Sequence, residues 1–172
     1  KLIGKVAFRI TKKGGYRMDD RTFRNAMGRF ATGVTVVTTK TKDDVHGMTA
    51  NAFMSVSLTP KLISISIDNK ANMLKKIKES KQFAVNILSN QQQDISMHFA
   101  GQMKLDRKIE FDFIRGIPII ENALVSVVCD LEDTYVVGDH TLFIGRVLDI
   151  KTTEGDPLTF YGGKYGMNAT VS

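Results

Sequence analysis

Small polar side chains recur at every second position between residues 47 and 57, where the sequence reads GMTANAFMSVS. If this segment forms one β-strand, its side chains alternate between two faces. One face then carries five groups, which are Thr49, Asn51, Phe53, Ser55 and Ser57. Hydroxyls and amides hydrogen-bond to phosphates or to ring heteroatoms, and the alanines beside Asn51 let a ligand approach the backbone closely. The pattern predicts a ligand-binding strand, with a solvated strand face as the ordinary alternative.

Two further segments carry groups suited to binding. A Gly-Asp pair at 138–139 fits a tight turn between long strands predicted at 123–137 and 140–151, so His140 can reach over the mouth of a barrel. The segment 160–166, FYGGKYG, combines aromatic rings that can stack on a planar ligand with glycines that permit positive φ. A solvated turn and a tail that packs on the fold are the alternatives for these two segments.

Several other kinds of site are excluded. A glycine pair with P-loop spacing occurs at 28–33, but Val34 stands where the lysine of that loop belongs, and no Gly-x-Gly-x-x-Gly occurs. The three histidines, His46, His98 and His140, are far apart and lack a cysteine partner, which argues against a metal site. No Ser-His-Asp arrangement or nucleophile elbow appears, so the sequence nominates no catalytic residue.

The elements that must position these groups are mostly short strands. Apolar residues at helical spacing predict a helix that begins at Asp19 or Asp20 and stops at Gly33, and further helices are expected at 69–78 and 89–99. The polar segment 102–118 is expected to be a loop. Strands are predicted, from β-branching or alternation, at 34–39, 45–53, 62–67, 82–88, 123–137 and 140–151. Many short strands with few helices favour an antiparallel barrel over alternating βαβ units.

The positive charge of the chain is concentrated at its beginning. The 172 residues include 24 basic and 18 acidic side chains, a net charge of +6. Six of the basic residues and no acidic residue lie in 1–17, so 18 of each remain in 18–172 and the net charge there is zero. This distribution argues against a nucleic-acid partner. We expect 1–17 to be an N-terminal extension and 18–172 to be one domain.

The extension has features of a translated leader. A purine-rich run can encode residues 12–15, a few nucleotides before the codon of Met18. Met18 is therefore a candidate start, and 1–17 a candidate leader or vector-derived sequence. A genuine basic arm or an extra strand is the alternative, because apolar residues alternate at 6–10.

The sequence also bears on location. No apolar run approaches the ~20 residues that a membrane-spanning helix needs, and the extension lacks the core of a secretory signal. The single cysteine, Cys129, cannot form an intrachain disulfide and lies in an apolar run, which indicates a buried, inert thiol. We therefore expect a cytoplasmic protein with no membrane partner.

Six segments, in register along the chain, resemble the short-chain flavin reductases, the reductase partners of two-component flavin-dependent aromatic monooxygenases. The segments are FATGVTVV at 30–37, GMTANAFMSVS at 47–57, NIL at 86–88, FAG at 99–101, GDHTLFIG at 138–145 and FYGGKY at 160–165. The likeness begins near Met18 and is nearest to the small reductase components of phenol 2-hydroxylase and 4-hydroxyphenylacetate 3-monooxygenase. Residues 102–118 are less typical of the family, so no role is carried over to them.

The resemblance implies a mainly β fold with a few helices, a split antiparallel β-barrel of FMN-binding-like, Greek-key type that forms a homodimer. It implies FAD, or FMN, as the cofactor and NADH as the co-substrate, which together reduce flavin for a partner monooxygenase. No metal and no catalytic side chain are implied. The residues implied at the flavin are Thr35, Ala50, Asn51, Ala52, Phe53, Phe99 and Ala100, with Ser55, Ser57 and Lys70 at its phosphates. His140 and Tyr165 are implied to meet the NADH.

Three alternatives remain open. An oxidase of the pyridoxamine phosphate type, on a related barrel, needs several arginines for the substrate phosphate, and arginine is sparse in 18–172. A non-catalytic flavin-binding or redox-sensing module keeps the barrel but does not oxidise NADH. An oligonucleotide-binding barrel needs a basic, aromatic groove, which the zero net charge of 18–172 disfavours.

Overall fold

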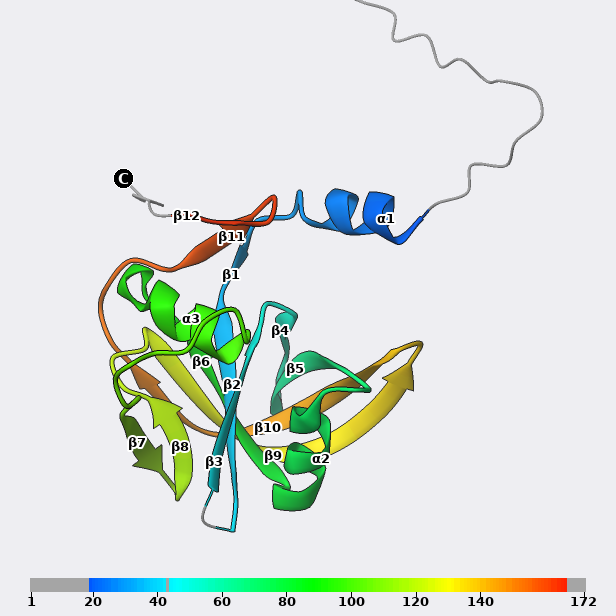
Figure 1. Ribbon diagram of the computed structural model, residues 1–172. Coiled ribbons are helices and arrows are strands. Elements are labelled where there is room, and N and C mark those ends of the chain that lie inside the picture. Colours follow the sequence, from blue (N-terminus) through cyan, green and yellow to red (C-terminus); the bar gives the residue numbers. More distant parts are fainter. Residues whose placement is uncertain (1–18, 43, 167–172) are drawn as a thin grey trace, which may run out of the picture.

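A computed structural model describes residues 19–42 and 44–166, and the predicted N-terminal extension at 1–17 lies outside the described residues. Seven antiparallel strands form the main sheet, in the order β3-β2-β6-β9-β10-β5-β4 (Figure 1). Their bounds are β2 Thr35–Thr41, β3 Asp44–Ala50, β4 Phe53–Leu58, β5 Lys61–Asp68, β6 Gln82–Ile87, β9 Val125–Val137 and β10 His140–Thr152. The strands β9 and β10 meet in a hairpin at 138–139, as predicted from the Gly-Asp pair.

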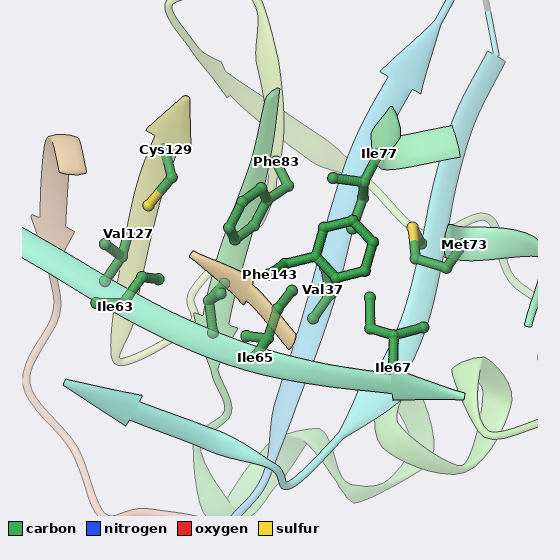
Figure 2. Close-up of a cluster of buried hydrophobic side chains, with 11 residues drawn as sticks. Val37, Ile63, Ile65, Ile67, Met73, Ile77, Phe83, Val127, Cys129 and Phe143 are labelled. Carbon is green, nitrogen blue, oxygen red and sulfur yellow. The ribbon is translucent and has the colours of Figure 1, made fainter. Parts of the chain in front are cut away.

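The main sheet is rolled around one apolar core. Strands β2 and β5 are four positions apart in the sheet order, yet their side chains pack in the same cluster (Figure 2). The buried members are Val37, Ile63, Ile65, Ile67, Met73, Ile77, Phe83, Val85, Val127, Cys129 and Phe143. β-branched and aromatic side chains dominate this list because they pack well on a pleated surface. The prediction of a mainly β fold with a few helices is confirmed.

The buried cysteine behaves as predicted. Cys129 is free and fully buried on β9. Its burial, with a smaller contribution from the charge of Asp130, raises the pKa of the thiol to about 12. The thiol therefore stays protonated and packs as a small apolar group.

Smaller elements flank the main sheet. A three-stranded sheet joins β1 (Thr32–Gly33), β11 (Thr159–Tyr161) and β12 (Lys164–Gly166). The helices are α1 (Asp20–Met27), α2 (Asn72–Ser80), the short 3-10 helix η1 (Asn90–Gln92) and α3 (Gln93–Phe99), and α1 projects away from the sheet in Figure 1. Among the described residues, no helix combines the length and apolar character needed to cross a membrane.

The first helix begins as predicted but ends early. The Asp19 carboxylate accepts a hydrogen bond from the N–H of Thr22 at 2.7 Å and caps α1. The helix stops at Met27 rather than at Gly33, because the chain turns at Gly28 and then enters β1, which pairs with β11. None of the residues of α1 is buried in the described chain.

The segment 102–118, predicted to be a loop, contains most of a hairpin. Strands β7 (Phe111–Ile114) and β8 (Ile117–Ile120) pair across Arg115 and Gly116. Both turn residues have positive φ, at 53° and 79°, which is the geometry of a two-residue hairpin turn. Apolar residues on both sides of this Arg-Gly pair were the available signal. Only the part before β7 remains a loop.

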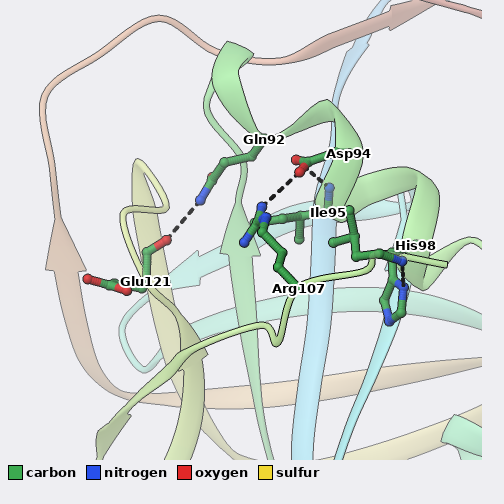
Figure 3. Close-up of polar contacts among 7 residues, drawn as sticks. Gln92, Asp94, Ile95, His98, Arg107 and Glu121 are labelled. Atoms are coloured by element: carbon green, nitrogen blue, oxygen red, sulfur yellow. Dashed lines mark hydrogen bonds and ion pairs between the residues drawn. The ribbon is translucent and has the colours of Figure 1, made fainter.

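Polar contacts tie that remaining loop to α3 (Figure 3). Arg107 forms an ion pair of 2.7 Å with Asp94, and the N–H of Leu105 donates to Nδ1 of His98 at 3.2 Å. At the N-terminal end of α3, the side-chain amide of its cap residue Gln92 donates to the carbonyl of Glu121 at 2.8 Å. These contacts fix the orientation of α3, whose last residue is Phe99.

Candidate functional site

A cleft with a volume of about 990 Å³ lies beside the start of β2, β4 and β10 and the middle of β5. Thr35 and Ser64 are buried and form its floor, together with Ser66 and Leu142. Its walls are mostly apolar and aromatic, with Phe30, Phe53 and Phe160 from three different segments. This size and composition suit a flat organic cofactor, because such pockets are largely apolar with a few directed polar groups.

The prediction of a single strand over residues 47–57 is wrong, because the chain breaks into two strands at the cleft. Strand β3 ends at Ala50 and β4 begins at Phe53, and these two strands lie at opposite edges of the main sheet. Asn51 and Ala52 form the link, in which the N–H of Phe53 donates to the Asn51 carbonyl at 3.0 Å. Alanine and asparagine favour strands weakly, which is consistent with a break at this point.

The break separates the residues that alternation had placed on one face. Thr49, on β3, donates its hydroxyl to the carbonyl of Ser96 on α3 at 2.7 Å, so it belongs to the packing of that helix. Asn51 and Phe53 line the cleft, as does Ala52 between them. The carbonyl of Ala52 accepts from the N–H of Ser66 at 3.1 Å, which holds the link against β5.

Four of the residues implied by the resemblance line the cleft, and these are Thr35, Asn51, Ala52 and Phe53. Ala50 stands directly behind them, since its carbonyl accepts the Thr35 hydroxyl at 2.6 Å. The others lie outside the residues that line the cleft. Ser55 and Ser57 continue along β4, with a bulge between them, and Lys70 follows β5 with its N–H bonded to the Asp68 carboxylate at 2.8 Å.

Phe99 and Ala100 lie at the end of α3, against the face of β3. A Cβ added at Gly47 would approach three atoms of the Phe99 ring at 2.4, 2.6 and 2.9 Å, so that ring lies directly on the glycine backbone. Phe99 also packs against Phe111, with ring centroids 6.4 Å apart. Ala100 is the exposed C-terminal cap of α3. The position of Phe99 therefore depends on the absence of a side chain at residue 47.

Tyr165 supports a wall of the cleft from behind. Its ring meets Phe160, which lines the cleft, edge to face at a centroid distance of 5.2 Å. Its hydroxyl shares a hydrogen bond of 2.9 Å with Ser96. The tail predicted to contain stacking aromatics thus folds as the β11–β12 hairpin and places Phe160 at the site.

His140 lies at the first position of β10, beyond the cleft. It is two residues from Leu142, which lines the cleft, so both side chains are on the same face of the strand. Its Nδ1 lies 2.7 Å from a carboxylate oxygen of Asp139. This hydrogen bond and the charge of the imidazole lower the pKa of Asp139. In the pairing with β5, His140 stands opposite Asp68, at the end of the polar face that Ser64, Ser66 and Asp68 form on that strand.

Several residues that line the cleft were not predicted from the sequence. Ser64 and Ser66 alternate with Ile63, Ile65 and Ile67 on β5, and the isoleucines fill the core while the serines face the cleft. The alternation was recognised, but its polar face was not assigned to a site. Arg24 from α1 is the single charged residue that lines the cleft in the described part of the chain.

Among the described residues, no group of three or more histidine, cysteine, aspartate or glutamate side chains is arranged to hold a metal ion. The polar groups at the cleft are instead hydroxyls, an amide, backbone atoms and the guanidinium of Arg24. Such groups hydrogen-bond to the heteroatoms of a ring, and the phenylalanines offer flat apolar surfaces for the ring itself. The residues present therefore fit a planar heteroaromatic cofactor such as flavin.

Two solved structures resemble this one closely. Flavin reductase PheA2 in its native state has a TM-score of 0.87 and 57% sequence identity, covering 89% of this chain and 100% of that chain. The NADH:FAD oxidoreductase SgcE6 of Streptomyces globisporus, in complex with NAD and FAD fragments, has a TM-score of 0.82 and 33% identity, covering 89% of this chain and 95% of that chain.

Sequence relatives agree with the structural likeness. An NADH-dependent flavin reductase from Rhodococcus sp. is 46% identical over 145 residues, which cover 83% of this chain and 82% of the relative. The reductase component of 4-hydroxyphenylacetate 3-monooxygenase from Thermus thermophilus is 35% identical over 144 residues, covering 83% and 93%. The family described as flavin reductase like domain matches residues 27–168. The resemblance found in the sequence is thus confirmed, and the chain belongs to the flavin reductase like domain family.

Proposed function

We propose that this protein is an NADH-dependent flavin reductase, which reduces FAD, or FMN, and supplies the reduced flavin to a partner aromatic monooxygenase. The observation that carries the proposal is the cleft, in which aromatic walls surround a floor of hydroxyl groups, in a chain of this family. The partner is supported by the relative that is named as the reductase component of a monooxygenase.

The lining residues define where the flavin would bind. Thr35, Asn51, Ala52 and Phe53 would border the ring and the ribityl chain, which is supported by their place in the cleft. For the phosphates we propose Ser55, Ser57 and Lys70, which lie on β4 and after β5, strands that reach the cleft. Ala50 would also border the flavin, and Phe99 and Ala100 would lie beside its ring, although none of the three is among the residues that line the cleft.

The chemistry resides in the cofactor rather than in a side chain. A bound flavin supplies the acceptor for the hydride of NADH. The task of the protein is then to hold two flat rings in contact and to exclude water, for which aromatic walls suffice. We propose that His140 and Tyr165 orient the NADH, His140 through the imidazole that Asp139 holds at the end of the polar face.

Exposed apolar residues around the cleft support a homodimer. Phe23, Met27 and Phe30 precede β1, Met54 and Leu58 lie on β4, and all five are exposed, with Leu58 at 86%. Clustered apolar side chains of this size mark an interaction surface. We propose that a second copy of the chain covers them. We also propose a cytoplasmic location, for which the unpaired, buried Cys129 is the supporting observation.

One assay tests the proposal. The purified protein is denatured to release and identify any flavin, and NADH oxidation is then followed with and without added FAD. We expect NADH oxidation that depends on FAD. A protein that binds flavin but does not oxidise NADH would be a non-catalytic flavin-binding or redox-sensing module, and a protein that binds no flavin would refute the proposal entirely.

The role of His140 is tested separately. We expect His140→Ala to raise the Michaelis constant for NADH more than it lowers turnover, because the imidazole would position the nucleotide without taking part in the chemistry. His46→Ala is the matched control, since His46 bonds to Thr41 and does not line the cleft. Unchanged NADH kinetics in His140→Ala would remove this residue from the site.

A further inference from the structure

We infer that the hydroxyls of Ser64 and Ser66, on the floor of the cleft, hydrogen-bond to the heteroatom edge of the flavin ring. The inference rests on the proposed function and assigns two flavin contacts that neither the sequence patterns nor the family resemblance indicated.

Ser64 is only 8% exposed and lines the cleft. Within residues 19–42 and 44–166, its hydroxyl makes no hydrogen bond, and the Ser66 hydroxyl makes none either. Other buried serines are bonded, since Ser96 shares a hydrogen bond with Tyr165 and Ser126 donates to Asn86. The Ser64 and Ser66 hydroxyls therefore have no partner within the described part of the protein, and both residues line the cleft, so these hydroxyls are free to bond to a molecule bound there.

The Ser64 hydroxyl is accessible to such a ligand. Thr32 Oγ1 is fully enclosed and has no partner, so no ligand atom can reach it without a rearrangement. The Ser64 hydroxyl, by contrast, is not enclosed in this way, because it borders the open volume of the cleft. Ser64 and Ser66 are therefore groups that a bound molecule can contact directly.

The strand geometry points both hydroxyls the same way. Ser64 and Ser66 are alternate residues of β5, so their side chains share one face and are separated by roughly 7 Å along the strand. The opposite face carries Ile63, Ile65 and Ile67, which fill the core. Small side chains at these two positions leave room for a flat ring and present one donor each along its edge.

The surroundings indicate which part of the flavin they meet. Phosphates are held by cations or by clusters of backbone N–H groups, whereas the neighbours of Ser64 in the sheet are Met54 and Ile144, and Leu142 pairs with Ser66. The dimethylbenzene edge of the ring offers no acceptor and would leave the hydroxyls unpaired. The edge that carries ring nitrogens and carbonyl oxygens is the part that satisfies both serines.

Flavin binding by the apoprotein tests the inference without relying on activity. Quenching of flavin fluorescence gives dissociation constants for FAD and for lumiflavin, which has the ring but neither ribityl chain nor phosphate. We expect Ser64→Ala and Ser66→Ala each to weaken binding of both compounds by roughly fivefold, and the double variant by about 20-fold or more, as expected for one hydrogen bond each.

The control is Ser126→Ala, which removes a buried hydroxyl that bonds to Asn86 and does not line the cleft. It should lower thermal stability and leave both dissociation constants unchanged. Ser64→Cys replaces Ser64→Ala if the latter fails to fold, because it keeps the volume and weakens the donor. Folded single variants that bind both compounds within twofold of the wild type would overturn the inference, as would a loss confined to FAD. A wild-type protein that binds neither compound would refute the proposed function itself.

Discussion

Gly47→Ala should destabilise the protein because the Phe99 ring occupies the space that a side chain would need. The added Cβ would lie 2.4 Å from the nearest ring atom, against a favourable carbon–carbon separation of about 3.5 to 4.0 Å. The ring would have to move by roughly 1 Å to restore contact. It cannot do so freely, because it packs on His98 and Phe111 at centroid distances of 5.1 and 6.4 Å.

Overpacking of this kind costs about 1 to 3 kcal/mol. Urea unfolding of the apoprotein, followed by far-ultraviolet circular dichroism, measures it. With a slope of roughly 2 kcal/mol per molar urea, we expect the midpoint to fall by about 0.5 to 1.5 M. Because Phe99 is proposed to stand beside the flavin, the same variant should also weaken FAD binding.

The control variant is Gly33→Ala, where an added Cβ meets no atom within 4 Å. Its midpoint should stay the same or rise slightly, since alanine restricts the unfolded chain. Phe99→Leu should relieve the clash, so that Gly47→Ala costs less in that background than in the wild type. A midpoint shift below about 0.2 M for Gly47→Ala, or additive effects in the double variant, would refute the reasoning.

Three further predictions concern the core and the edge of the site. Gly145→Ala should lower the urea midpoint by at least as much as Gly47→Ala, because its Cβ would lie 2.6 Å from the buried Phe83 ring and 2.9 Å from Cβ of Cys129; an unchanged midpoint would contradict the packing. Cys129, whose pKa burial raises to about 12, should resist a thiol-labelling reagent at pH 8 in the native protein and react once urea unfolds it, whereas rapid labelling of the native state would show that the thiol is accessible. The hydrogen bond with His140 lowers the pKa of Asp139, so the pair stabilises the fold above the ordinary pKa of aspartate, and this stabilisation is lost as the pH falls through the lowered value. In His140→Ala, a carboxyl titration by nuclear magnetic resonance should show the pKa of Asp139 rising toward its ordinary value, and an unchanged pKa would contradict the contact.

Local signals predicted most of the strands and the hairpin. Alternation and β-branching located β5, β6 and β9–β10, and a Gly-Asp pair located the turn at 138–139. The cap at Asp19 was also evident, since its carboxylate needs only the backbone three residues ahead. Each of these features depends on interactions close in sequence, which a pattern of residue types can reveal.

The features that the sequence did not reveal depend on contacts between distant segments. The break at Asn51 exists because β3 and β4 pair with different strands at opposite edges, which no local pattern encodes. The place of Ser64 in the cleft lining became visible only when β5 was placed beside β10. Phe99 was predicted from the family resemblance, but its dependence on Gly47 required the packing of α3 on β3.

The two-residue link at 51–52 lies where the rolled sheet begins and ends. Residues from β2 at one side of the sheet order and from β4 and β5 at the other all border the same cleft. A molecule bound in the cleft would contact strands from both sides of the main sheet at once. Binding should therefore raise the midpoint of thermal unfolding and slow proteolysis, and both effects should grow as the dissociation constant of the ligand falls.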